Sequence, residues 1–357
     1  MKRMCLLLLA AAPFMLGSQG AGASTAYGDL NNFDTVNDTG QECHGFEIEI
    51  EGAHSTDITY TYDWNHYGPP RITEGTSSTG GPVVFIRYES AKNSDGTWAA
   101  YTAVPAGTLA PTDGHMCTNP AVNEGCEHFG VGYYGAPTAI RYNWLVDNGG
   151  VLVHHTSPVM VATPSWTYQA PVGVQPAVVV AVIPAPVVPV EAGKQFGEPS
   201  FVKVIKTTTH SAINVALKDL VSDDKNEDGF NDWQNAEPAE VETEFKLLQA
   251  NDGANPAKEE LKGNEDDAGD GSETVTRRYE FYKYGAAADT IDQENGEAMC
   301  DEVNPTNDPD DPLYLHGVGN SVEVTDANGG SYTVDCAAQV VVGDYIGAQM
   351  AGFDAAM

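Results

Sequence analysis

The feature that most constrains the fold is a series of short segments in which apolar and polar residues alternate. In "HGFEIEIEG" (44–52), Phe46, Ile48 and Ile50 alternate with three glutamates, which is typical of a β-strand with one buried face. Similar segments occupy 56–64, 81–90, 97–107, 138–148, 150–156 and 165–170, with Gly-, Pro- and Asn-containing turns between them. Many short strands joined by polar turns favour a β-sandwich over an α/β sheet, so we expect a mainly β protein.

A Val-, Ala- and Pro-rich stretch at 172–194 interrupts this series. Its prolines would break a membrane helix repeatedly, whereas its Pro-free core, 177–183, fits one buried strand. We therefore predict a β-sandwich-like domain at 24–171, a connector at 172–194, and an acidic second domain at 195–357. The second domain is expected to be β-rich with minor α structure, and its best helix candidate is 238–251, where a strand is the alternative.

The first residues have the layout of a secretory signal peptide. Lys2 and Arg3 precede an apolar core at 6–16, and a run of small residues ends at Ala23, as expected for a cleaved export signal. We expect cleavage between Ala23 and Ser24. The mature protein is then secreted or held at the cell surface, with no membrane insertion.

The chain is strongly acidic, with 51 acidic and 17 basic residues and a net charge of −34. A surface of this sign repels nucleic-acid phosphates and anionic lipids. Nucleic-acid partners are therefore not expected, and an extracellular protein or a glycan is the expected partner. The same charge favours the binding of cations.

Removal of the signal peptide, which contains Cys5, leaves five of the six cysteines. In an exported protein, disulfide pairing between cysteines near in sequence is expected. We predict the disulfides Cys117–Cys126 and Cys300–Cys336, and Cys43 is left without an assigned partner.

A metal site is the alternative interpretation of the first cysteine pair. His115-x-Cys117 and Cys126-x-His128 would place two nitrogen and two sulfur ligands on facing extended segments, a set that suits zinc or copper(I). The one-residue gaps differ from the usual zinc spacing, and an exported compartment oxidises free thiol pairs. The disulfide is therefore the favoured interpretation.

An acidic loop, "DKNEDGFNDWQN" (224–235), resembles the calcium loops of thrombospondin type 3 repeats and dockerins. Calcium prefers six to eight oxygen ligands, which alternate side chains on a tight loop supply. The resemblance implies these ligands: Asp224, Asn226, Asp228, Asp232 and the carbonyl of Phe230. Asn235 stands where an EF-hand has a bidentate glutamate, which weakens the expected affinity. Calcium is the expected cofactor, in a structural role.

Tyr60, Tyr62 and Trp64 fall on one face of the predicted strand 56–64 and would suit stacking against a sugar ring. Aromatic residues at this spacing also form sandwich cores and cross-strand pairs, so both interpretations stay open. No nucleophile elbow, phosphate-binding loop or His-Glu-x-x-His motif is present. The sequence therefore identifies no catalytic residue, and an enzyme is not the favoured class.

Two segments, "FGVGYYGAPTAIRYNWLVDN" (129–148) and "VVVGDYIGAQMAGFDAA" (340–356), resemble the N-terminal regions of large, uncharacterised secreted bacterial proteins that carry immunoglobulin-like domains. The resemblance implies an exported, β-rich, non-enzymatic protein and transfers no site residue. The sequence thus predicts an exported, acidic, disulfide-stabilised binding or structural module, stabilised by calcium. The alternatives are a carbohydrate-binding or carbohydrate-active protein, and a copper- or zinc-binding protein.

Overall fold

A computed structural model describes most of the chain between residues 26 and 355. The described residues are 26–63, 66–109, 117, 124–157, 159–169, 172–173, 178–186, 193–207, 243–251, 253–262, 266–267, 274–286, 290–292, 294–300, 321–325, 331–335 and 340–355. Within them the protein is mainly β and its sheets are antiparallel, which confirms the predicted fold class.

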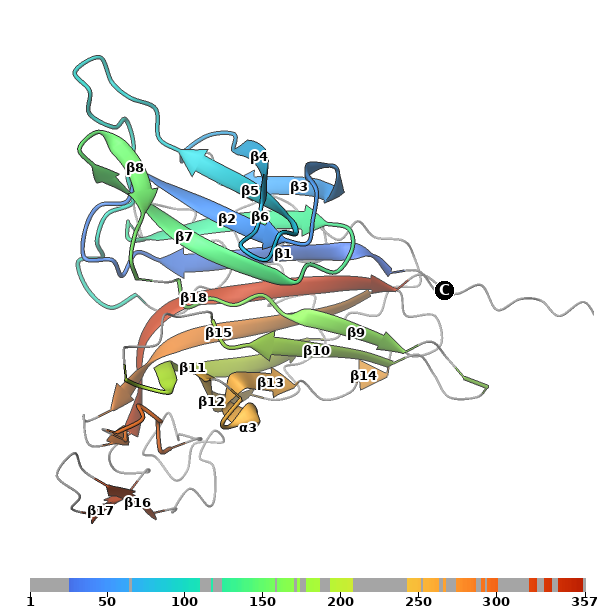
Figure 1. Ribbon diagram of the computed structural model, residues 1–357, viewed down its shortest axis with the longest axis vertical. Helices are drawn as coiled ribbons and strands as arrows, with labels where there is room; N and C mark the ends of the chain where they lie inside the picture. The colour runs from blue at the N-terminus through green and yellow to red at the C-terminus, as the bar shows by residue number, and fades with distance from the viewer. Residues whose placement is uncertain are drawn as a thin grey trace, which may run out of the picture.

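A seven-stranded antiparallel sheet forms the centre of the molecule (Figure 1). In spatial order its strands are β12 (Thr243–Asn251), β11 (Phe196–Thr207), β15 (Thr274–Ala286), β18 (Val340–Ala355), β1 (Ala26–Val36), β6 (Cys126–Tyr133) and β3 (Ile58–Asp63). Among the strands that the structure describes, β12 and β3 are therefore at its edges.

Smaller sheets and two short helices complete the described part. A five-stranded sheet has the order β4 (Arg71–Thr76), β5 (Pro82–Glu89), β2 (Gly45–Glu51), β7 (Ala139–Asn148) and β8 (Val151–His154). A four-stranded sheet contains β13 (Glu260–Lys262), β10 (Val178–Pro184), β14 (Asp266–Asp267) and β9 (Ser165–Gln169). β16 (Ser321–Thr325) pairs with β17 (Ser331–Asp335), and the helices are η1 (Ser55–Asp57) and α3 (Pro256–Glu259). Neither of these helices is long and apolar enough to cross a membrane.

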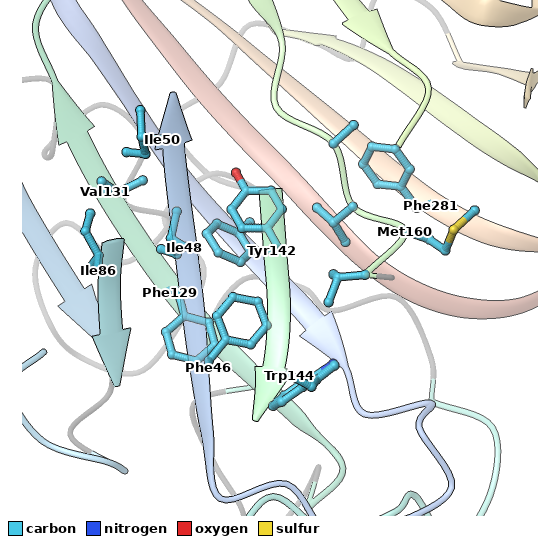
Figure 2. Packing of buried hydrophobic residues seen from close by; sticks show 14 of the residues in the cluster. Phe46, Ile48, Ile50, Ile86, Phe129, Val131, Tyr142, Trp144, Met160 and Phe281 are labelled. Carbon is cyan, nitrogen blue, oxygen red and sulfur yellow. The ribbon is translucent and has the colours of Figure 1, made fainter. Parts of the chain in front are cut away.

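The five-stranded sheet packs face to face on the β1–β6 part of the central sheet, and together they form a β-sandwich. Phe46 of β2 stacks on Phe129 of β6 with ring centroids 4.5 Å apart (Figure 2). Phe33 of β1 lies 4.5 Å from Tyr142 of β7. The alternation in β2 explains this arrangement, because Phe46, Ile48 and Ile50 are all fully buried while the glutamates between them point away from the core.

The central sheet continues across the predicted domain boundary. β1 pairs with β18, so that Phe33 lies opposite Gln349, and the main apolar cluster contains Phe33, Ile183 and Phe281. The two predicted domains therefore share one sheet and one core. Within the predicted connector, the Pro-free core forms β10, which pairs with β9, β13 and β14.

The helix expected at 238–251 is wrong for the part that the structure describes. Residues 243–251 form the edge strand β12, which pairs with β11. Leu247 and Leu248 are both buried, one in each apolar cluster. They point to opposite faces of the sheet, so burial on both faces selects the strand.

Candidate functional site

Two tyrosines form a platform on the edge strand β3. The rings of Tyr60 and Tyr62 are nearly parallel, with an interplanar angle of 11° and centroids 6.2 Å apart, and both side chains are half-buried. They are alternate residues and so share one face of the sheet. We call this pair the tyrosine platform. Trp64, the third predicted member, lies outside the described residues.

Glycines on the neighbouring strand β6 leave space for the two tyrosine side chains. Tyr60 lies opposite Gly132 and Tyr62 opposite Gly130 on β6. A Cβ atom built on Gly130 would lie 3.4 Å from Tyr62 Cβ and 3.5 Å from Tyr60 Cε1. The tyrosine side chains thus reach over the glycine backbone, where a larger residue on β6 would displace them.

A half-buried amide continues this row of residues. Asn32 on β1 lies opposite Gly130, on the side away from Tyr62. Because residues opposite one another on adjacent strands share a face, the Asn32 amide and the tyrosine platform lie on the same side of the sheet. An amide can both donate and accept hydrogen bonds. The face therefore combines aromatic surface with a polar group suited to hydroxyls.

A buried acid–imidazole pair lies beside the platform. Asp34 and His128 are opposite one another on β1 and β6, and Nδ1 of His128 is 2.7 Å from Oδ1 of Asp34. Both side chains are only 5% exposed. The His128 ring meets the Tyr62 ring edge-on, with centroids 5.9 Å apart at 82°. The carboxylate fixes the imidazole, and the imidazole in turn supports Tyr62.

Further charged groups follow on the same face. Ala348 of β18 lies opposite Asp34 and also opposite Glu280 of β15. Glu280 accepts a 2.8 Å hydrogen bond from the Tyr282 hydroxyl, and its Oε1 lies 3.4 Å from Arg278 Nε. These three side chains are buried. The face thus carries two separate charged clusters with a small alanine between them.

The opposite face of β6 carries a second buried network. Oε1 of Glu127 lies 2.5 Å from both His66 Nδ1 and Thr102 Oγ1. The Tyr67 hydroxyl contacts Thr102 Oγ1 and donates a 3.0 Å hydrogen bond to the Cys43 carbonyl. The hydrogen bond to Glu127 raises the pKa of His66. Burial raises the pKa of the Cys43 thiol to about 12, so this free cysteine stays protonated and is not a nucleophile. The network is structural.

The cysteines largely decide the metal alternative. Cys117 and Cys126 are joined by a disulfide with an S–S distance of 2.16 Å, and His128 is paired with Asp34. Both sulfurs are therefore unavailable as thiolates, and the structure favours the disulfide over a zinc or copper site. His115 lies outside the described residues. Cys300 is also disulfide-bonded, but its predicted partner Cys336 is not among the residues described.

Within the described ranges, no group of three or more His, Cys, Asp or Glu side chains is arranged to hold a metal ion. The predicted calcium loop, 224–235, lies entirely outside those ranges. Calcium binding therefore stays a prediction from the sequence.

The comparisons with known proteins add no functional residue. Asn32, Asp34 and Glu280 have no distinguishing signal in the local sequence, because a polar residue in a strand segment usually faces solvent. The chain matches no family model, and the searches of curated proteins and of solved structures find no significant match. The site must therefore be interpreted from its own chemistry.

Proposed function

We propose that the protein is an exported binding module that binds a saccharide on the face formed by Tyr60, Tyr62 and Asn32. The observation that carries the proposal is the pair of parallel, half-buried tyrosine rings beside the glycines of β6. Export is supported by the signal-peptide pattern and by the Cys117–Cys126 disulfide.

The chemistry of this face suits a sugar ring. A pyranose has an apolar side of C–H groups that packs on an aromatic face, while its hydroxyls require hydrogen-bond donors and acceptors. Binding sites of this kind combine apolar walls with a few well-placed polar groups. Here the two rings supply the apolar wall and Asn32 supplies the polar group. The Asp34–His128 pair holds the Tyr62 ring in position and does not itself need to contact the ligand.

Rigid support favours binding, because side chains that are already ordered lose less entropy when the ligand arrives. Tyr62 is restrained on two sides, by the Tyr60 ring at 6.2 Å and by the His128 ring at 5.9 Å. A single exposed tyrosine would lack this restraint.

A glycan array followed by titration calorimetry on the best ligand tests the proposal. We expect Tyr62→Ala to weaken binding at least tenfold, which corresponds to about 1.4 kcal/mol, and Asn32→Ala to weaken it for ligands with free hydroxyls. Tyr101→Ala is the matched control, because Tyr101 is an exposed tyrosine whose ring lies beside His44. The proposal fails if the wild-type protein binds no glycan, or if Tyr62→Ala binds as well as the control.

A further inference from the structure

The five-stranded and four-stranded sheets cover the same face of the central sheet (Figure 1). Phe33 and Phe129 on that face contact the five-stranded sheet. Val202 and Phe281 on the same face belong to the main apolar cluster with Ile183 of β10. Strands β1, β18 and β15 therefore pass beneath the line where the two covering sheets meet.

Polar side chains gather along this line. Gln349 of β18 lies opposite Phe33 on one side and Tyr279 on the other. Asn31 and Thr35 lie two residues either side of Phe33 and point to the same face. All four polar residues are at most 1% exposed. We call Asn31, Thr35, Tyr279 and Gln349 the polar seam.

Small residues on β18 flank Gln349, but the place beside Gly347 is filled, because a Cβ there would lie 2.6 Å from Val161 Cγ2 and would overlap the Asp34 carbonyl. Along the same face, Gln349 is preceded by Gly347 and followed by Ala351. Ala351 lies between Asn31 on β1 and Arg277 on β15. It is fully buried, and its neighbours on both adjacent strands are polar residues.

One polar atom of each residue in the seam lacks a hydrogen-bond partner among the residues that the structure describes. These atoms are Asn31 Oδ1, Thr35 Oγ1, Tyr279 Oη and Gln349 Oε1. The two amide nitrogens are bonded elsewhere, Asn31 Nδ2 to the Tyr133 hydroxyl at 3.2 Å and Gln349 Nε2 to the Met350 carbonyl at 3.3 Å. Buried polar groups in proteins are almost always hydrogen-bonded to protein or to ordered water. Four exceptions on three adjacent strands therefore require a common explanation.

We propose that the polar seam is an internal binding site for ordered water, centred on Gln349. Water complements this set, because it donates to the two amide oxygens and accepts from the two hydroxyls. Gln349 lies on β18, between the strands that carry the other three residues, so a water bound at its Oε1 has seam residues on both sides. A buried water makes about three hydrogen bonds, and Asn31 and Thr35 are about 13 Å apart along β1 at roughly 3.3 Å per residue, so the seam requires more than one water.

Two buried tyrosines provide a matched test. Tyr279 and Tyr142 belong to the same apolar cluster, but the Tyr142 hydroxyl is already bonded to Thr163 Oγ1. Water-¹⁷O relaxation dispersion counts long-lived internal waters in solution. We expect Tyr279→Phe to lose at least one such water relative to wild type, and Tyr142→Phe to lose none. An unchanged count in Tyr279→Phe would overturn the proposal.

A crystal structure of the wild-type protein at about 1.6 Å keeps the test independent of how the variants fold. The expected result is ordered water within hydrogen-bonding distance, about 2.7–3.2 Å, of Gln349 Oε1 and at least one other atom of the seam. Direct protein contacts to those atoms would overturn the proposal. So would a bound organic molecule there, seen as excess mass in native mass spectrometry.

Discussion

The buried pair Asp34–His128 gives the sharpest test of the site. Nδ1 of His128 is 2.7 Å from Oδ1 of Asp34, and both side chains are 5% exposed. Removing one member of such a pair leaves the other in a poorly solvated position, which typically costs about 3–5 kcal/mol. Replacing both with apolar residues of similar volume is often neutral or stabilising. We therefore expect His128→Leu to lower the free energy of unfolding by about 3–5 kcal/mol, and the double variant with Asp34→Leu to recover most of this loss.

Urea unfolding followed by tryptophan fluorescence and far-UV circular dichroism measures all four corners of this double-mutant cycle. The surface pair Arg71–Glu89 is the control, because its side chains are 58% and 34% exposed and its N–O distance is 3.5 Å. Exposed pairs of this kind contribute roughly 0–1 kcal/mol. If the two losses at Asp34 and His128 simply add, or if His128→Leu costs no more than the control, then the pair does not act as a unit and the support of Tyr62 has another origin.

Four further predictions concern the core, the disulfide, pH and calcium. Phe129→Ala should cost about 3–5 kcal/mol in urea unfolding, because it empties the centre of the sandwich; a loss below about 1 kcal/mol would contradict the packing. Replacing Cys117 and Cys126 by serine should cost about 2.7 kcal/mol, the chain entropy of a ten-residue loop, and non-reducing peptide maps should show the two linked. His66 has a raised folded pKa, so its stabilising contribution is complete below the unfolded value of about 6.5 and is lost as pH rises through the folded value. Parallel melting profiles of wild type and His66→Gln from pH 5 to 9 would refute this. Millimolar calcium should raise the melting temperature several degrees over EDTA, and Asp228→Ala should abolish the difference.

Local pattern was sufficient to predict the fold class and the burial of individual strands. The alternation of Phe46, Ile48 and Ile50 predicts which face of β2 is buried, and all three are fully buried. The Pro-free run in the connector likewise predicts a buried strand, which is β10. Both predictions concern burial along a single segment, which the composition and the hydrophobic period of that segment indicate directly.

Local sequence pattern does not predict which strands pair or which polar side chains contact one another at the site. Residues 26–36 carry Asn31 on one face and Asp34 on the other, both buried, so the segment lacks the apolar alternation that marks a strand. Its pairing with β18 depends on residues far away in the chain. The same holds for His128. Its spacing from Cys126 suggested a metal ligand, but its imidazole contacts the Asp34 carboxylate on β1 instead.

The pairing of β1 with β18 also constrains how the protein matures. Synthesis delivers the chain N-terminus first, so Thr35 emerges long before Gly347, its neighbour in the sheet. Until then, β1 has an open edge in what will be the middle of the central sheet, and unpaired edges invite pairing with other chains. Contacts between such distant residues also form slowly. The central sheet is therefore incomplete until β18 has been synthesised. Until then, a holding chaperone or rapid folding of the rest of the chain has to protect the edge of β1.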